Sequence, residues 1–221
     1  MRPVERALSF GSVAEAYERY RPGYPETVVD LLLEHVTPEG RALEVGAGTG
    51  KATRAVAARG VPVRAVEPDP EMRAVLQRMT AGLPVTITAA TLETLPSWVT
   101  DEPHDLLYAA AAWHWTDPVT RWAGAASLLP ERGVFASTGG PVDLVDESLE
   151  AAVERVRSEV TTTDQVHFWP APGPGLRWPG DELDASPWHR RRGARPDHHA
   201  LVGRRPGDRA DVDRLGVADG A

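Results

Sequence analysis

A glycine-rich run preceded by a glutamate is the strongest chemical signal in the sequence. It spans residues 44–50, reads EVGAGTG, and lies between an expected strand over 42–45 and an expected helix. Glycines at such a turn let the backbone approach a ligand closely, and the free N–H groups at the start of a helix bind anionic groups. A dinucleotide fingerprint, G-x-G-x-x-G, would need its third glycine at Lys51, so this spacing disfavours an NAD-dependent oxidoreductase.

The glycine spacing resembles motif I of the class I S-adenosylmethionine-dependent methyltransferases. A second landmark agrees, because Glu67 ends the next expected strand, where a carboxylate can accept hydrogen bonds from both ribose hydroxyls. The alternative for Glu67 is a solvated acid beside a structural turn. The resemblance implies S-adenosyl-L-methionine as the cofactor and the following cofactor-binding residues: Glu44, Gly46, Ala47, Gly48, Gly50, Glu67, Pro68, Leu92 and Glu93.

Residues 91–96, TLETLP, form a third landmark. They resemble the A-E-x-L-P segment that borders the adenine in the small-molecule methyltransferases, with Glu93 and Pro96 matching. Leu92 stands where that family has a small residue, and this leaves backbone groups as a route to adenine recognition. The alternative is an ordinary loop, since loops are rich in acids and prolines.

Residues 104–118 form a fourth landmark that is similar to the segment following strand four in the family. In an open α/β sheet, reactive groups gather beyond the carboxyl ends of the strands, and residues 113–115 fall there. His114 is the candidate catalytic base, and Trp113 and Trp115 are candidates to face the sulfonium or an apolar substrate. The alternative is that both indoles pack against helices while His114 bonds a backbone carbonyl.

The N-terminal stretch, residues 10–25, resembles the helix and loop that close over the cofactor in the same family. Tyr17 and Arg21 offer aromatic and cationic groups suited to a zwitterionic ligand, and we assign both to the substrate pocket. The alternative is a peripheral helix whose tyrosines are half buried.

The elements that must position these groups alternate regularly. Short strands are expected at 42–45, 63–66, 85–88, 105–110 and 133–136, with helices between them and a last helix over 147–160. This alternation predicts an α/β fold, a Rossmann-like parallel sheet of about five strands with helices on both faces. We divide the chain into lid helices (1–36), a cofactor-binding methyltransferase domain (37–163), a loop-rich remnant (164–188) and a tail (189–221).

The tail is rich in Arg, Asp, Gly and Ala and shows no periodicity. We therefore expect it to be disordered or out of frame, and strands six and seven of the family's sheet to be missing. A frameshift just after Trp188 is the favoured explanation for this apparent truncation, and a genuine basic tail is the alternative. A missing strand seven would leave strand five as an exposed edge.

Composition narrows the remaining possibilities. The net charge of −8 argues against a nucleic-acid partner, and without cysteine no disulfide or thiolate zinc site can form. The histidines lack metal-binding spacing, so we expect no metal, and the absence of a long apolar run predicts a soluble, cytoplasmic protein with no membrane partner. The prediction is methyl transfer to a small-molecule acceptor. A truncated, non-catalytic cofactor-binding domain is the alternative, and the oligomeric state stays open.

Overall fold

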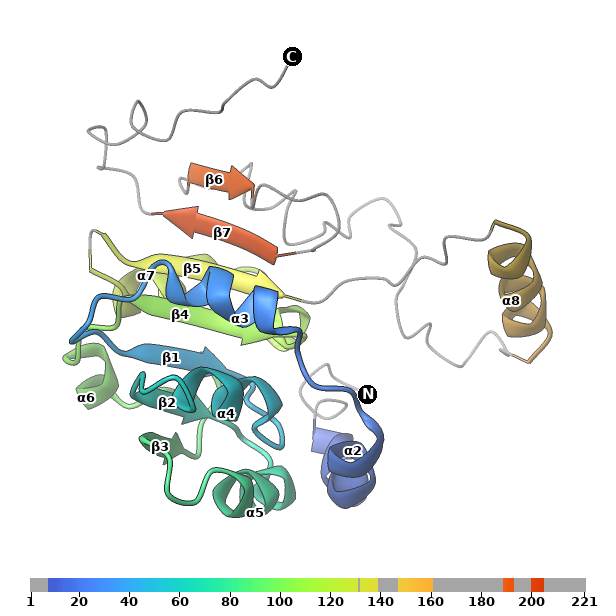
Figure 1. Cartoon of the computed structure of the whole chain (residues 1–221), viewed down its shortest axis with the longest axis horizontal. Helices are drawn as coiled ribbons and strands as arrows, with labels where there is room; N and C mark the ends of the chain where they lie inside the picture. Colours follow the sequence, from blue (N-terminus) through green and yellow to red (C-terminus); the bar gives the residue numbers. More distant parts are fainter. Residues whose placement is uncertain (1–7, 131, 139–146, 161–188, 193–199, 205–221) are drawn as a thin grey trace.

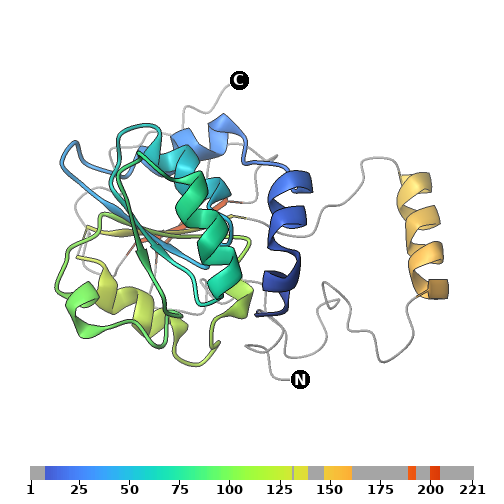
Figure 2. The same cartoon turned by 90° about the horizontal axis from the view of Figure 1, so that it is seen from below.

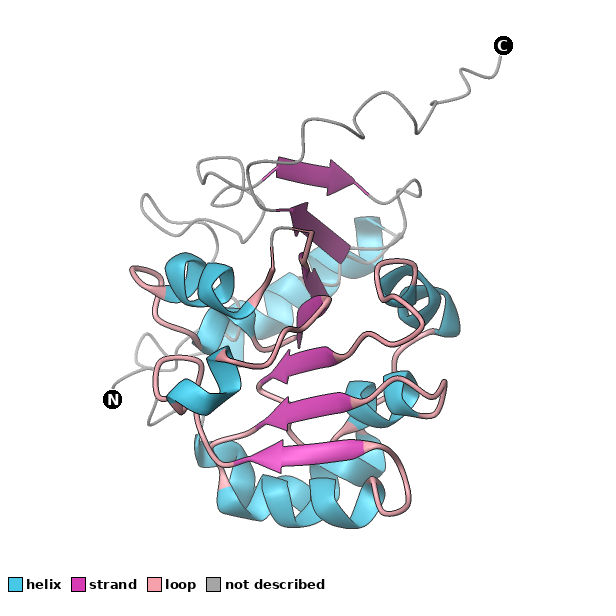
Figure 3. Ribbon diagram, turned by 90° about the vertical axis from the view of Figure 1, so that its left-hand side faces the viewer, coloured by secondary structure: helices cyan, strands magenta, loops and turns pink. Residues whose placement is uncertain are grey.

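The computed structural model describes residues 8–130, 132–138, 147–160, 189–192 and 200–204, and within them one mixed sheet dominates (Figures 1 and 3). Its strands follow the order β3-β2-β1-β4-β5-β7-β6. The strand bounds are β1 Ala42–Val45, β2 Val63–Val66, β3 Val85–Thr88, β4 Leu106–Ala110, β5 Val134–Thr138, β6 His189–Arg192 and β7 Ala200–Arg204.

The five strands β1 to β5 run parallel to one another, which confirms the predicted Rossmann-like sheet. β1 lies between β2 and β4, with Ala42 opposite both Val63 and Leu106. The order reverses at β1, because the chain first builds outward through β2 and β3 and then crosses back to β4 and β5. In such sheets the ligand crevice lies outside the carboxyl ends of the strands at this reversal.

The expectation that strands six and seven are missing is wrong. β7 pairs antiparallel with β5, from Thr138 opposite Ala200 to Val134 opposite Arg204, and β6 pairs antiparallel with β7. The prediction was drawn from side-chain composition, whereas a strand ladder is made by backbone groups that an arginine-rich segment also carries. β5 is therefore covered by β7. The segment 164–188 and the rest of the tail lie outside the described residues.

The helices cover both faces of the sheet (Figure 2). On one face, α6 and α7 pack over β4 and β5, and the cluster they bury includes Leu107, Phe135 and Trp113. On the other face, α3 and α4 bury Val29, Leu32 and Val56 against the strands. Element bounds are η1 Leu8–Val13, α2 Ala14–Tyr20, α3 Glu26–Leu33, α4 Lys51–Ala57, α5 Pro70–Met79, α6 Ser97–Thr100, η2 Trp113–Trp115, α7 Arg121–Leu128 and α8 Glu147–Val160.

Local sequence signals explain where several elements begin. Asp69 caps α5 by accepting hydrogen bonds from the backbone N–H groups of Glu71 and Met72, and Pro70 takes the first helical position. Ser12 and Glu15 have the spacing of a capping box, but the residue at the N-cap of α2 is Val13, which has no side-chain cap bond. None of the described helices has the length and apolar character of a membrane span.

The N-terminal helix α2 packs beside α5 rather than on the sheet. Ala14 of α2 is buried against Met72 and Val75 of α5, with Phe10 and Tyr17 packed on this small cluster. This contact brings α2 to the carboxyl ends of the central strands, where the glycine turn begins.

Candidate cofactor site

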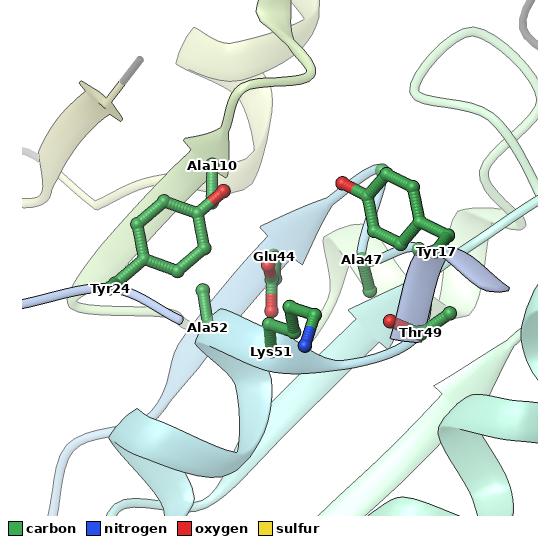
Figure 4. Close-up of a pocket in the computed structure, with 10 residues that line it drawn as sticks. Tyr17, Tyr24, Glu44, Ala47, Thr49, Lys51, Ala52 and Ala110 are labelled. Carbon is green, nitrogen blue, oxygen red and sulfur yellow. The ribbon is translucent and has the colours of Figure 1, made fainter. Parts of the chain in front are cut away.

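A cavity lies at the carboxyl end of β1, between the glycine turn and the N-terminal segment (Figure 4). Five of the residues that the sequence predicts for the site line it: Tyr17, Glu44, Gly46, Ala47 and Gly48. The structure thus brings residues from α2, β1 and the glycine turn to one place.

The glycine turn needs glycine for two physical reasons. Gly46, Gly48 and Gly50 all have positive φ, at 69°, 58° and 87°, a region that L side chains rarely adopt. The backbone of Gly46 also lies so close to Ala112 that an added Cβ would be 2.5 Å from the Ala112 Cβ. A Cβ added at Gly48 would instead face open space, so this part of the turn remains accessible to a ligand.

Glu44 is a fully buried carboxyl at the floor of the cavity. It is 1% exposed, and its Oε2 accepts hydrogen bonds from the Thr53 hydroxyl (2.5 Å) and the Tyr108 hydroxyl (2.9 Å). Burial raises the pKa of Glu44 to about 7, although the hydrogen bonds from Thr53 and Tyr108 act in the opposite direction. Glu44 is therefore poised to titrate near neutral pH, and a cationic ligand group beside it would favour the ionised form.

Glu67 stabilises the glycine turn through a hydrogen bond. Its Oε2 accepts the Gly48 N–H at 2.7 Å and its Oε1 accepts the Asp69 N–H at 2.9 Å, with the residue 7% exposed. Burial raises the pKa of Glu67, and the two backbone hydrogen bonds partly offset that rise. A carboxylate has about four lone-pair sites, so Glu67 can still accept hydrogen bonds from a ligand.

The segment after β4 is held in a strained turn. Ala111 adopts a φ of 56°, unusual for a residue with a side chain, and the 3-10 turn η2 follows immediately. Trp113 is 1% exposed and packs on Trp122 and Phe135 at ring-centroid distances of 5.1 and 4.4 Å. Its predicted pocket role is therefore wrong, because the indole is committed to the core.

His114 and Trp115 project from the same turn toward the N-terminal segment. The Trp115 ring lies 4.6 Å from His114 and 6.0 Å from Phe10 of η1. His114 is exposed at the surface. Desolvation by the surrounding protein and the positive charges of Arg121 and Arg21 lower its pKa to about 4. Its imidazole is consequently neutral at physiological pH, the form that can accept a proton.

The remaining predicted residues lie around the cavity rather than in its lining. Leu92 is buried in the core, and Glu93 is exposed with its carboxylate accepting the Asp117 N–H at 2.7 Å. Glu93 thus ties the loop after β3 to the segment after β4. Pro68 follows Glu67, Gly50 precedes α4, and Arg21 lies over the Tyr17 ring at 5.5 Å.

Several lining residues were not predicted from the sequence. Thr49, Lys51, Ala52 and Ala110 also line the cavity, and so does Tyr24, which belongs to the N-terminal stretch expected to close over the cofactor. Thr49 and Lys51 lie within or beside the glycine run, so the motif itself could have identified them. Among the described residues, no group of three or more His, Cys, Asp or Glu side chains is placed to hold a metal ion.

Comparison with known proteins agrees with this geometry. Residues 43–137, from β1 to β5, match the family model described as a methyltransferase domain. This part of the chain is a methyltransferase domain. It contains the glycine turn, Glu44, Glu67 and the segment after β4.

Curated relatives point to the same family. The chain is 42% identical over 142 residues to uncharacterised methyltransferases of Mycobacterium tuberculosis and Mycobacterium bovis, which covers 64% of this chain and 53% of each relative. The chain therefore spans about half the length of the curated relatives it matches.

Solved structures share the architecture of the methyltransferase domain. A putative type II methyltransferase from Anaeromyxobacter dehalogenans superposes with a TM-score of 0.53 at 27% identity, covering 72% of this chain and 70% of that one. Magnesium protoporphyrin IX methyltransferase from Synechocystis, solved with S-adenosylhomocysteine bound, gives a TM-score of 0.60 at 14% identity, covering 92% and 100%. At 14% identity, the similarity to the Synechocystis enzyme shows only that the two proteins share a fold.

Proposed function

We propose that this protein transfers a methyl group from S-adenosyl-L-methionine to a small-molecule acceptor. The observation that carries the proposal is the cavity at the carboxyl end of β1, where the glycine turn, Glu44 and the tyrosines of the N-terminal segment meet inside a methyltransferase domain. A protein with the same fold, the magnesium protoporphyrin IX methyltransferase from Synechocystis, is solved with S-adenosylhomocysteine bound and supports the same class of reaction.

The residues present fit a zwitterionic nucleoside cofactor. Glu44 supplies negative charge at the floor of the cavity for the cofactor's ammonium group, and the open face of Gly48 allows a close approach to the backbone. Glu67 retains lone pairs for the ribose hydroxyls at the end of β2. We assign Glu44, the glycine turn and Glu67 to the cofactor. Pro68, Leu92 and Glu93 remain predictions from the sequence.

We assign the binding of the methyl acceptor to His114, Trp115 and Arg21. S-adenosyl-L-methionine supplies an electrophilic methyl group, which an acceptor attacks in line, so the protein mainly positions the two partners. Neutral His114 can accept the proton that a hydroxyl or an acidic carbon releases, although a pKa of about 4 makes it a weak base at neutral pH. Trp115 and Arg21 provide an apolar and a cationic surface beside it. Cytoplasmic location and the absence of nucleic-acid partners remain predictions from the sequence.

A labelled-methyl assay tests the proposed activity. The full chain is incubated with methyl-labelled S-adenosyl-L-methionine and a set of small hydroxyl, amine and carbon acids, and transfer of label is measured. We expect label to pass to one of these acceptors, and His114→Ala to reduce the rate with an oxygen or carbon acceptor about 10²-fold or more while cofactor affinity changes little. Cofactor binding without transfer to any member of the set would indicate a non-catalytic domain and contradict the proposal.

A further inference from the structure

Glu18, near the end of α2, is joined to the glycine turn and to α4 by three residues. Its Oε2 accepts the Thr49 hydroxyl at 2.6 Å, and its Oε1 accepts Arg54 Nη2 at 2.7 Å. The Lys51 ammonium donates to the backbone carbonyl of Glu18 at 2.7 Å and lies 3.5 Å from Oε1. All of these donors belong to the segment that frames the cavity, so one residue fastens the N-terminal helix to it.

This attachment is far better shielded from water than the other ion pair of the helix. The side chains of Glu18 and Lys51 are 13% and 9% exposed, whereas those of Glu15 and Arg78, which join α2 to α5, are 73% and 55% exposed. Exposed pairs contribute little because solvent screens them, whereas loss of one partner from a shielded, hydrogen-bonded pair mainly accelerates dissociation. Glu18 is therefore expected to carry most of the electrostatic attachment of α2.

The carboxylate of Glu18 is ionised at neutral pH. Partial burial acts to raise its pKa, but the hydrogen bonds from Thr49 and Arg54 and the charges of Arg54 and Lys51 outweigh that effect and lower the pKa. The attachment is thus fully formed under physiological conditions.

The position of α2 limits access to the cavity. Tyr17, which precedes Glu18, lines the cavity beside Ala47 and Thr49 of the glycine turn (Figure 4). The helix α2 and the glycine turn therefore form two walls of the same cavity. Outward movement of α2 would open this wall and expose a ligand bound against the glycine turn.

We infer that Glu18 is a positioning residue that latches α2 and Tyr17 over the bound cofactor, and so sets the rate at which the cofactor leaves. The identity of the ligand rests on the proposed function, whereas the attachment of α2 to the glycine turn does not. Glu18 acts through Tyr17 and the cavity wall, and its role is therefore in retention rather than in chemistry.

Release of labelled S-adenosyl-L-methionine, chased with excess unlabelled compound, tests this role in the full chain. Glu18→Gln removes the charge but keeps the size of the side chain, and Glu15→Gln makes the same change at the exposed pair of the same helix. We expect Glu18→Gln to release the cofactor about tenfold faster or more. Glu15→Gln is expected to stay within about twofold of the unsubstituted protein. Equal release rates for the two variants would overturn the inference.

Hydrogen exchange of residues 14–20 without ligand separates failure of this inference from failure of the proposed function. We expect faster exchange in Glu18→Gln than in Glu15→Gln, because the helix detaches more often. If the unsubstituted chain binds no S-adenosyl-L-methionine, the proposed function fails, and unequal exchange still supports the latch. Equal exchange in both variants refutes the latch whatever the ligand.

Discussion

Replacing Glu44 with glutamine should remove a specific pH dependence of stability. The buried carboxyl has a pKa of about 7 in the folded protein and 4.5 as its ordinary value, chiefly because burial penalises its charged form. At pH values between 4.5 and about 7, Glu44 in the folded protein holds a proton that the same residue has lost in the unfolded chain. Stability therefore falls as the pH rises from about 4.5 and reaches its full loss above pH 7.

The size of this effect follows from the two pKa values. Each unit of difference corresponds to about 1.4 kcal/mol, so ionisation of Glu44 lowers the free energy of unfolding by about 3 kcal/mol at pH 8 relative to pH 4. Glu44→Gln keeps an oxygen that can accept hydrogen bonds from Thr53 and Tyr108 but cannot ionise. Any cost of burying the new amide group is independent of pH and cancels when two pH values are compared.

Urea unfolding at pH 5 and pH 8, followed by tryptophan fluorescence, measures the effect. The stability of Glu44→Gln relative to the unsubstituted protein should improve by about 2–3 kcal/mol between pH 5 and pH 8. Glu39→Gln, at an exposed position, serves as the control and should show no such change. A difference for Glu44→Gln that is constant across pH would refute the assignment of a raised pKa to this carboxyl.

Two further substitutions test the glycine turn and the aromatic core. Gly46→Ala should lower the free energy of unfolding by about 2–4 kcal/mol, because the positive φ of Gly46 is combined with a clash against Ala112. Gly60→Ala, where φ is also positive but the added Cβ meets open space, should lower it by about 1 kcal/mol. Similar losses for the two variants in urea unfolding would contradict this account. Trp113→Ala should destabilise the protein by about 3–5 kcal/mol and Trp115→Ala by less than about 2 kcal/mol, as measured by thermal unfolding. The reverse order would show that Trp115 is the core residue.

The central strands and helices could be predicted because their local signals agree with their tertiary roles. β1, β2, β3 and α8 lie at the predicted residues, and Asp69 caps α5 as its place before Pro70 indicates. The terminal strands β6 and β7 could not be predicted in this way. The sequence of β6 is His-Arg-Arg-Arg, which has no alternation of apolar and polar residues. Its pairing depends on backbone groups of β7, and composition does not report on those.

The site was predictable where motif and geometry coincide. The glycine turn and Glu44 are defined by residues adjacent in sequence, and they line the cavity together. Trp113 and Trp115 are only two residues apart, yet a strained turn sends one into the core and leaves the other near Phe10. Sequence spacing could not reveal this difference, because it depends on the unusual backbone conformation of Ala111.

Isothermal titration of the full chain with S-adenosyl-L-methionine and, separately, with NAD tests the central claim most directly. Glu67→Ala accompanies the unsubstituted protein, since loss of this carboxylate removes both the proposed ribose acceptor and the hydrogen bond to the Gly48 N–H. We predict saturable binding of S-adenosyl-L-methionine at one site, no binding of NAD, and loss of binding in Glu67→Ala. Saturable binding of NAD alone, or unchanged affinity in Glu67→Ala, would contradict the account.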